Sequence, residues 1–104
     1  MKHGWCSMLL LLACAAQAQD VRDAPALQAA SLAASCTGCH GTQGRAVTGS
    51  AVPGLAGQPA SNIVEQMKAF KSGARTATVM HQIAKGYSDV QVDQLAAYFA
   101  AQKK

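Results

Sequence analysis

Apolar side chains recur every three or four residues along much of the chain, a spacing typical of amphipathic helices. The clearest stripes lie in residues 60–72 and 89–102 and consist of Ile63, Val64, Met67 and Phe70, and of Val92, Leu95, Ala96 and Phe99. Gly73 is suited to ending the first of these helices, and Ser88 to capping the start of the second. The pattern therefore predicts two helices, at 60–72 and 89–102.

Two weaker helical patterns complete the predicted fold. Pro25 suits a first helical turn and opens a helix over residues 25–36, and Gly86 closes a short helix at about 78–85. The first of these would bury a face made of Leu27, Ala30, Ser31 and Ala34. Residues 41–59 hold five glycines and two prolines and predict a loop. The expected fold class is a small all-α domain of about four helices.

The first 20 residues have the pattern of an export signal. Lys2 begins a short positive start, an apolar run extends from Met8 to Ala16, and Ala16-Gln17-Ala18 matches the small-x-small site of signal peptidase. The run is about half of the roughly 20 residues that span a bilayer, so no transmembrane segment is predicted. Cleavage after Ala18 would remove residues 1–18 and leave one periplasmic domain, residues 19–104.

An alternative processing route is also open. Leu11-Leu12-Ala13-Cys14 resembles the lipobox of bacterial lipoproteins, although Leu12 is a poor residue for its place in that motif. In that case Cys14 would carry a lipid anchor and the domain would face the periplasm.

Composition and charge exclude several function classes. The 104 residues are 50% hydrophobic, 13% charged and 5% aromatic, with 9 Lys and Arg against 5 Asp and Glu. This composition excludes a disordered polyelectrolyte and a nucleic-acid binder that acts through massed basic charge. Removal of Lys2 with the leader changes the formal charge from +4 to +3, because 8 basic residues then face 5 acidic ones. Such a surface favours an acidic partner, or merely keeps the domain soluble.

Two of the four cysteines lie in the predicted leader, and the other two form the motif Cys36-Thr37-Gly38-Cys39-His40. A C-x-x-C-H run attaches c-type haem: two thiols add to the haem vinyl groups and the histidine ligates the iron. The spacing lets both sulfurs reach one side of the porphyrin and sets the next residue against the iron. We therefore predict one covalent haem c held through Cys36, Cys39 and His40.

Three other uses of the two cysteines are weaker. A thioredoxin-like redox pair would need a βαβ frame, and no strands are predicted. A zinc site would need four ligands, whereas residues 19–104 offer two cysteines and two histidines that are far apart in sequence. A disulfide across so short a loop would stabilise little. A covalent haem also suits a small domain with few aromatic residues, which needs an added staple.

The sixth ligand of the iron decides between electron transfer and ligand chemistry. Met67, Met80 and His81 are candidates, with Lys85 more distant. Met67 falls in the apolar stripe of its helix and is expected to be core. Met80 follows a loop of small residues and opens a short helix, so it is the preferred ligand, with His81 or an open site as alternatives. His81 is otherwise expected to be a surface residue beside the ligand.

The chain resembles class I cytochrome c over nearly all of residues 25–102. More specific similarity, to the cytochrome subunit of flavocytochrome c sulfide dehydrogenase and to related bacterial dihaem cytochromes, lies in residues 62–73, Thr78-Val79-Met80 and residues 83–89. The resemblance implies the class I cytochrome c fold, with Met80 as the distal ligand.

Further roles follow from the same resemblance. Val52-Pro53-Gly54-Leu55 matches the family's proline loop, which implies that the Pro53 carbonyl accepts a hydrogen bond from His40 and that Leu55 lies against the haem. The last helix would pack across the first with Leu95, Tyr98 and Phe99. This sequence departs from the dihaem members in having a single C-x-x-C-H motif.

The expected function is that of a periplasmic single-haem electron carrier with His40 and Met80 as iron ligands and no catalytic residues. Its partners would be redox proteins, such as a flavoprotein sulfide dehydrogenase subunit or a terminal oxidase, and not nucleic acid. Two alternatives stay open: the haem subunit of a flavin-dependent sulfide dehydrogenase complex, and a peroxidase or gas-binding haem protein. Arg45, Gln58 and Tyr87 are candidate partners of the haem propionates.

Overall fold

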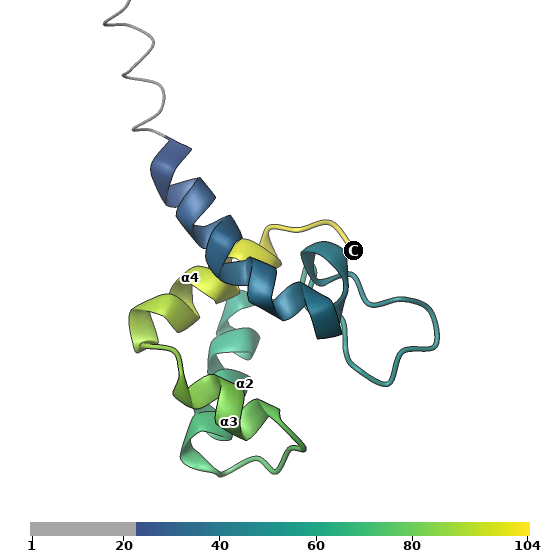
Figure 1. The fold of residues 1–104 in the computed structure, drawn as a ribbon, viewed down its shortest axis with the longest axis vertical. Helices are drawn as coiled ribbons and strands as arrows, with labels where there is room; N and C mark the ends of the chain where they lie inside the picture. Colours follow the sequence, from purple (N-terminus) through teal and green to yellow (C-terminus); the bar gives the residue numbers. More distant parts are fainter. Residues whose placement is uncertain (1–22) are drawn as a thin grey trace, which may run out of the picture.

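The computed structural model describes residues 23–104, which form an all-α domain with no strand in that range (Figure 1). The expected fold class is therefore confirmed. The elements are a first helix over residues 23–40, a 3-10 turn η1 (Thr42–Gly44), and the helices α2 (Ala60–Ser72), α3 (Met80–Lys85) and α4 (Asp89–Ala100). The predicted leader, its cleavage site and the Cys14 lipid anchor lie outside the described residues. Within residues 23–104, no helix is long and apolar enough to cross a membrane.

Helix α2 has the predicted bounds, whereas α3 begins two residues later and α4 ends two residues earlier than expected. The first helix differs more, because it continues through the C-x-x-C-H motif to residue 40. The Gly41 amide still bonds to the Thr37 carbonyl at 3.0 Å, so the helical hydrogen-bond pattern persists to the end of the motif. Gly41 then ends the helix with a φ of 86°, and a side chain there would meet the Arg45 carbonyl oxygen at 1.9 Å. The motif is thus a helical segment followed by an obligatory glycine.

The predicted buried face of the first helix is wrong. Leu27 is 65% exposed, whereas Ala33 is completely buried. Leu32 and Cys36 pack against the core beside Ala33, so the inward face is rotated relative to the predicted one. The alanine-rich helix has little difference in hydrophobicity between its faces, so the prediction of its buried face depended on one leucine, Leu27, and was wrong.

The core lies where α4 meets α2 and the first helix. The predicted stripe of α4 is its buried face, and Phe99 and Val92 are fully enclosed. Helix α2 packs against both α3 and α4, and the first helix crosses α4 as expected (Figure 1). Four of the nine buried apolar residues in the described range are alanines: Ala33, Ala56, Ala84 and Ala96. Few large side chains are thus available to fill the interior.

The start of α4 is fixed by the predicted cap. The Ser88 side chain accepts a hydrogen bond from the Gln91 amide, and the Gln91 side chain accepts one from the Ser88 amide. This reciprocal arrangement satisfies two backbone donors that a helix start leaves free. The capping box thereby sets the direction of α4 as the chain leaves α3.

Candidate functional site

The three chemical groups of the motif lie in the last two turns of the first helix. Residues three and four positions apart share one side of a helix, so Cys36, Cys39 and His40 face the same way. Cys36 is half-buried, Cys39 is exposed and His40 is only 8% exposed. Both cysteines are free thiols. The helix therefore presents two thiols and one imidazole on one side.

The orientation of His40 is fixed by the loop that follows. Its Nδ1 lies 2.7 Å from the Pro53 carbonyl oxygen, the hydrogen bond that the resemblance implied. Because a carbonyl only accepts, Nδ1 carries the proton and donates it. The imidazole is thus held in one tautomer, with Nε2 left as the free lone pair. A metal-ligating histidine is typically oriented and made more basic in this way.

The loop that carries Pro53 is tied down on both sides. The Gly44 carbonyl oxygen accepts hydrogen bonds from the amides of Leu55, at 2.7 Å, and Ala56, at 3.0 Å. The Gly57 amide donates to the carbonyl of Phe99 in α4 at 2.9 Å. Leu55 itself is partly buried and packs against the core. These contacts hold the Pro53 carbonyl in place without any direct bond from α4 to the motif.

A side-chain relay supports the same loop from α2. The Asn62 amide nitrogen donates to Gln58 Oε1 at 2.7 Å, and Gln58 Nε2 donates to the Gly54 carbonyl oxygen. Gln58, a candidate partner of a haem propionate, bonds in the structure to the loop next to Pro53. Asn62 was missed as a supporting residue, since nothing in its helical position marks it.

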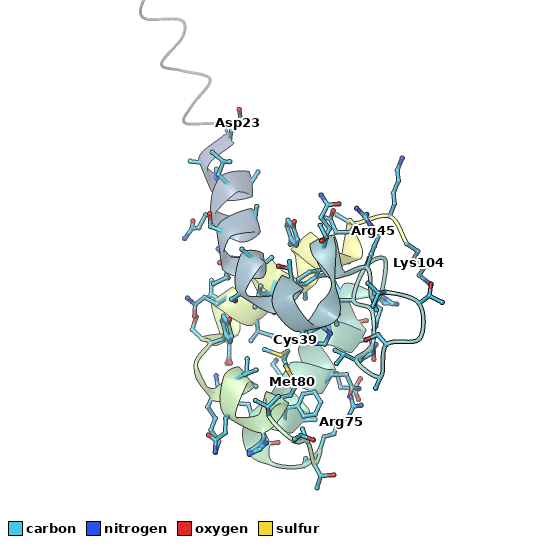
Figure 2. All side chains as sticks on the ribbon, turned by 45° about the vertical axis from the view of Figure 1, so that its right-hand side comes forward. Asp23, Cys39, Arg45, Arg75, Met80 and Lys104 are labelled. Atoms are coloured by element: carbon cyan, nitrogen blue, oxygen red, sulfur yellow. The ribbon has the colours of Figure 1, made fainter. Side chains whose placement is uncertain are left out.

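The candidate distal ligands differ in their surroundings. Met67 is a buried core residue, as predicted, and Lys85 is exposed. Met80 is the first residue of α3, half-buried and packed against the core. In the view of Figure 2, the labelled Met80 lies beside Cys39, between the first helix and α3. Met80 is thus placed for ligation opposite the motif.

His81 follows Met80 and is half-buried. Its Nδ1 is enclosed and has no hydrogen-bond partner among the described residues. Sequence considerations treated His81 as a surface residue, and this burial is greater than expected. The structure therefore does not remove His81 as an alternative ligand.

The remaining two candidate propionate partners also bond elsewhere. The Tyr87 hydroxyl lies 2.8 Å from Ser35 Oγ, and the Tyr87 carbonyl oxygen accepts a hydrogen bond from Lys71 Nζ at 2.7 Å. Arg45 Nη1 donates to the Lys103 carbonyl oxygen at 3.1 Å. None of these contacts was predicted, because each joins residues that are distant in sequence.

The protonation of Cys36 follows from its position. Burial raises the pKa of the Cys36 thiol, and the nearby Cys39 acts in the same direction, while a hydrogen bond with Ser35 opposes them. The thiol is therefore kept neutral at physiological pH. Conversion to a thioether would suit this half-buried place, since a thioether carries no charge at any pH.

The donor set fits a covalent haem better than a zinc ion. Within residues 23–104, no three His, Cys, Asp or Glu side chains lie close enough to hold a metal ion. Two free thiols, one oriented imidazole and one thioether are instead the groups that bind haem c. Val79 and Ile83, which flank Met80, are 52% and 39% exposed, so an apolar surface is available beside it for a flat apolar group.

Comparisons with known proteins agree with this site. The family model described as cytochrome c matches residues 26–103. The cytochrome subunit of sulfide dehydrogenase of Chlorobaculum tepidum is 41% identical over 68 residues, which cover 65% of this chain and 60% of that protein. Cytochrome c-554(548) of Halomonas halodenitrificans is 35% identical over 71 residues, covering 65% of this chain and 84% of the relative.

A solved structure gives the same fold. The cytochrome c4 structure of Acidithiobacillus ferrooxidans is 38% identical with a TM-score of 0.60, and the match covers 64% of this chain and 37% of that one. The chain thus spans less than two thirds of the sulfide dehydrogenase subunit and of the cytochrome c4 chain. Motif, fold and comparisons together show that the chain belongs to the cytochrome c family, whose members carry electrons.

Proposed function

We propose that this chain is a periplasmic cytochrome that carries single electrons between redox proteins through one haem c. Cys36 and Cys39 would hold the haem covalently, and His40 and Met80 would be its iron ligands. The observation that carries the proposal is the His40–Pro53 hydrogen bond of 2.7 Å, because it orients an imidazole for ligation beside two free thiols. The haem, when bound, supplies an iron that changes between the ferric and ferrous states.

The two ligands have distinct effects on that change. His40 is made more basic by the Pro53 carbonyl and is held rigid by burial. Met80 contributes a thioether, a weak donor to ferric iron that favours the ferrous state and raises the reduction potential. Since both axial positions would be filled by the protein, no position is left for a substrate. The residues thus support electron transfer rather than ligand chemistry.

The surface supports encounter with an acidic protein. Four lysines are exposed: Lys68, Lys85, Lys103 and Lys104. A fifth, Lys71, forms an ion pair in which its Nζ lies 3.4 Å from Asp89 Oδ1. Exposed positive charge speeds association with an acidic partner and does so less at high ionic strength. Cys39 is itself exposed, so the attachment side of the site is accessible to such a partner. A flavoprotein or a terminal oxidase would be a suitable partner.

Met80→Ala tests the ligand assignment. The variant should keep its haem, lose the far-red absorption of methionine–ferric iron, bind carbon monoxide readily and have a lower reduction potential. Met67→Leu is the matched control, because Met67 is a core residue whose replacement by leucine nearly conserves volume. If Met80→Ala leaves spectrum and potential unchanged, Met80 is not the ligand. Rapid binding of carbon monoxide to the unmodified ferrous protein would favour a peroxidase or gas-binding protein.

A second function is favoured by one comparison. The 41% identity to the cytochrome subunit of sulfide dehydrogenase makes a one-haem subunit of a flavin-dependent sulfide dehydrogenase the next candidate. Such a subunit would co-purify with a flavoprotein, and sulfide would reduce it only when that flavoprotein is present. A free carrier would purify alone and exchange electrons with several partners. Mass analysis of the exported protein would test how it is processed: a chain that starts at Gln19 without acyl mass supports a free periplasmic protein, whereas an acylated Cys14 would indicate a lipid-anchored protein that faces the periplasm.

A further inference from the structure

Tyr87 joins three parts of the fold that surround the proposed haem site. It lies between α3, which begins with Met80, and α4, which begins at Asp89. Its hydroxyl is 2.8 Å from Ser35 Oγ in the first helix, one residue before Cys36. Its carbonyl oxygen accepts a hydrogen bond from Lys71 Nζ in α2 at 2.7 Å. The end of α3 is thus tied both to the helix that carries the thiols and to α2.

The direction of the Ser35–Tyr87 hydrogen bond follows from the other contacts of Ser35. Ser35 Oγ donates to the Leu32 carbonyl oxygen at 3.1 Å, and a serine hydroxyl has one hydrogen to give. The Tyr87 hydroxyl is therefore the donor and Ser35 Oγ the acceptor. Cys36 Sγ lies 3.9 Å from the same Oγ. The tyrosine thus contacts the residue that adjoins the attachment point of the haem.

We propose that Tyr87 is a positioning residue that keeps α3 closed over the site and so holds Met80 on the iron. This inference rests on the proposed function, because it takes Met80 as a ligand. Helix α3 has six residues, and a helix this short depends on its neighbours for stability. The bond to Ser35 spans 52 positions in sequence and fixes the end of α3 opposite Met80. Loss of this bond frees the helix to move away from the haem face.

The effect is measurable as competition for the sixth ligand position. Imidazole binds ferric haem only when Met80 has left, so its apparent affinity reports the fraction of molecules in the open state. One hydrogen bond contributes about 1 kcal/mol, which corresponds to about a fivefold change in that fraction. Tyr87→Phe removes the hydroxyl and retains the ring. We expect it to bind imidazole about fivefold more tightly than the unmodified holoprotein.

Four further variants separate positioning from general stability. Tyr98→Phe is the matched control, because the Tyr98 hydroxyl makes no hydrogen bond within the described residues and its ring packs against Phe99. Ser35→Ala should bind imidazole as tightly as Tyr87→Phe does. Ser35→Thr, which retains a hydroxyl acceptor, should have the imidazole affinity of the unmodified protein. The double variant Ser35→Ala/Tyr87→Phe should bind imidazole no more tightly than either single variant, since the two residues share one interaction.

Titration of the oxidised holoproteins with imidazole decides the question. The inference is supported if Tyr87→Phe binds imidazole about fivefold more tightly, if Tyr98→Phe does not, and if the effect of Tyr87→Phe does not add to that of Ser35→Ala. An imidazole affinity of Tyr87→Phe equal to that of the unmodified protein, or additive effects in the double variant, overturns it. The spectrum of the unmodified protein tests the proposed function separately. If that spectrum lacks the signature of methionine-ligated iron, both the proposed function and the positioning role fail. If the signature is present and Tyr87→Phe leaves the imidazole affinity unchanged, only the positioning role fails.

Discussion

Gly44 is a position where a single added methyl group should disturb the loop that supports the site. Its φ is 78°, a value that residues with a side chain rarely adopt. A Cβ atom there would lie 2.7 Å from Phe99 Cδ1, 3.0 Å from the Ala56 nitrogen and 3.1 Å from Leu55 Cβ. Phe99 is 1% exposed, so the ring has little room to give way. Gly44→Ala therefore adds both backbone strain and crowding.

The two costs can be separated with a second glycine. A left-handed conformation costs an alanine about 1–2 kcal/mol, and overpacking a closed interior costs about 1–3 kcal/mol. Gly44→Ala should thus lower the free energy of unfolding by about 2–5 kcal/mol. Gly73 has nearly the same φ, 81°, but a Cβ atom there would have no neighbouring atom within 4 Å. Gly73→Ala should lower the free energy of unfolding only by the cost of the left-handed backbone conformation, about 1–2 kcal/mol.

Guanidinium denaturation of the two holoproteins, followed by far-ultraviolet circular dichroism, measures the difference. The reduction potential gives a second readout, because Gly44 holds the amides of Leu55 and Ala56 and thereby the loop with Pro53. A displaced Pro53 carbonyl would leave His40 less basic, and the potential should rise. Equal losses of stability in Gly44→Ala and Gly73→Ala would refute the packing described around Phe99.

Three further changes test other parts of the account. Gly38→Ala should raise the free energy of unfolding by about 0.5–1 kcal/mol, and with it the midpoint of thermal unfolding, because Gly38 is helical and an added Cβ would meet no atom within 4 Å. A lower midpoint would argue against a helical motif. Ser88→Ala should lower the free energy of unfolding by about 1 kcal/mol through loss of the capping box; denaturant midpoints equal to those of the unmodified protein would show that the cap contributes nothing. The double variant Cys36→Ala/Cys39→Ala, which attaches no haem, should be largely unfolded by circular dichroism, and a cooperative helical melt would speak against haem as the staple of the fold.

Strong local patterns were enough to predict much of the fold. The α4 stripe of Val92, Leu95, Ala96 and Phe99 combines large apolar residues with a serine cap, and its buried face was predicted correctly. The first helix lacks such contrast: Ala33 is buried and Leu27 is exposed, although hydrophobicity ranks them the other way. Packing of small residues against a crossing helix decides that face, and periodicity carries no information about it.

The C-x-x-C-H motif could be predicted from the sequence, whereas most of the contacts that hold it in place could not. Cys36, Cys39 and His40 are close in sequence, so their spacing alone indicates their chemistry. Contacts such as Ser35 with Tyr87 join segments that are distant in sequence. Only the folded chain brings these groups together, which is why the sequence offered Tyr87 only as a candidate propionate partner and did not predict its contact with Ser35. The contact between His40 and Pro53 was expected because a family resemblance, rather than residue pattern, placed it.

The proposed function depends on one haem that is attached at Cys36 and Cys39 and ligated by His40 and Met80. The visible spectrum of the exported protein, recorded oxidised and then reduced, tests it most directly. We expect the sharp bands of a low-spin c-type haem, with the weak far-red absorption of methionine–ferric iron in the oxidised state. A high-spin spectrum would contradict ligation by Met80, and a protein without haem would contradict the claim as a whole.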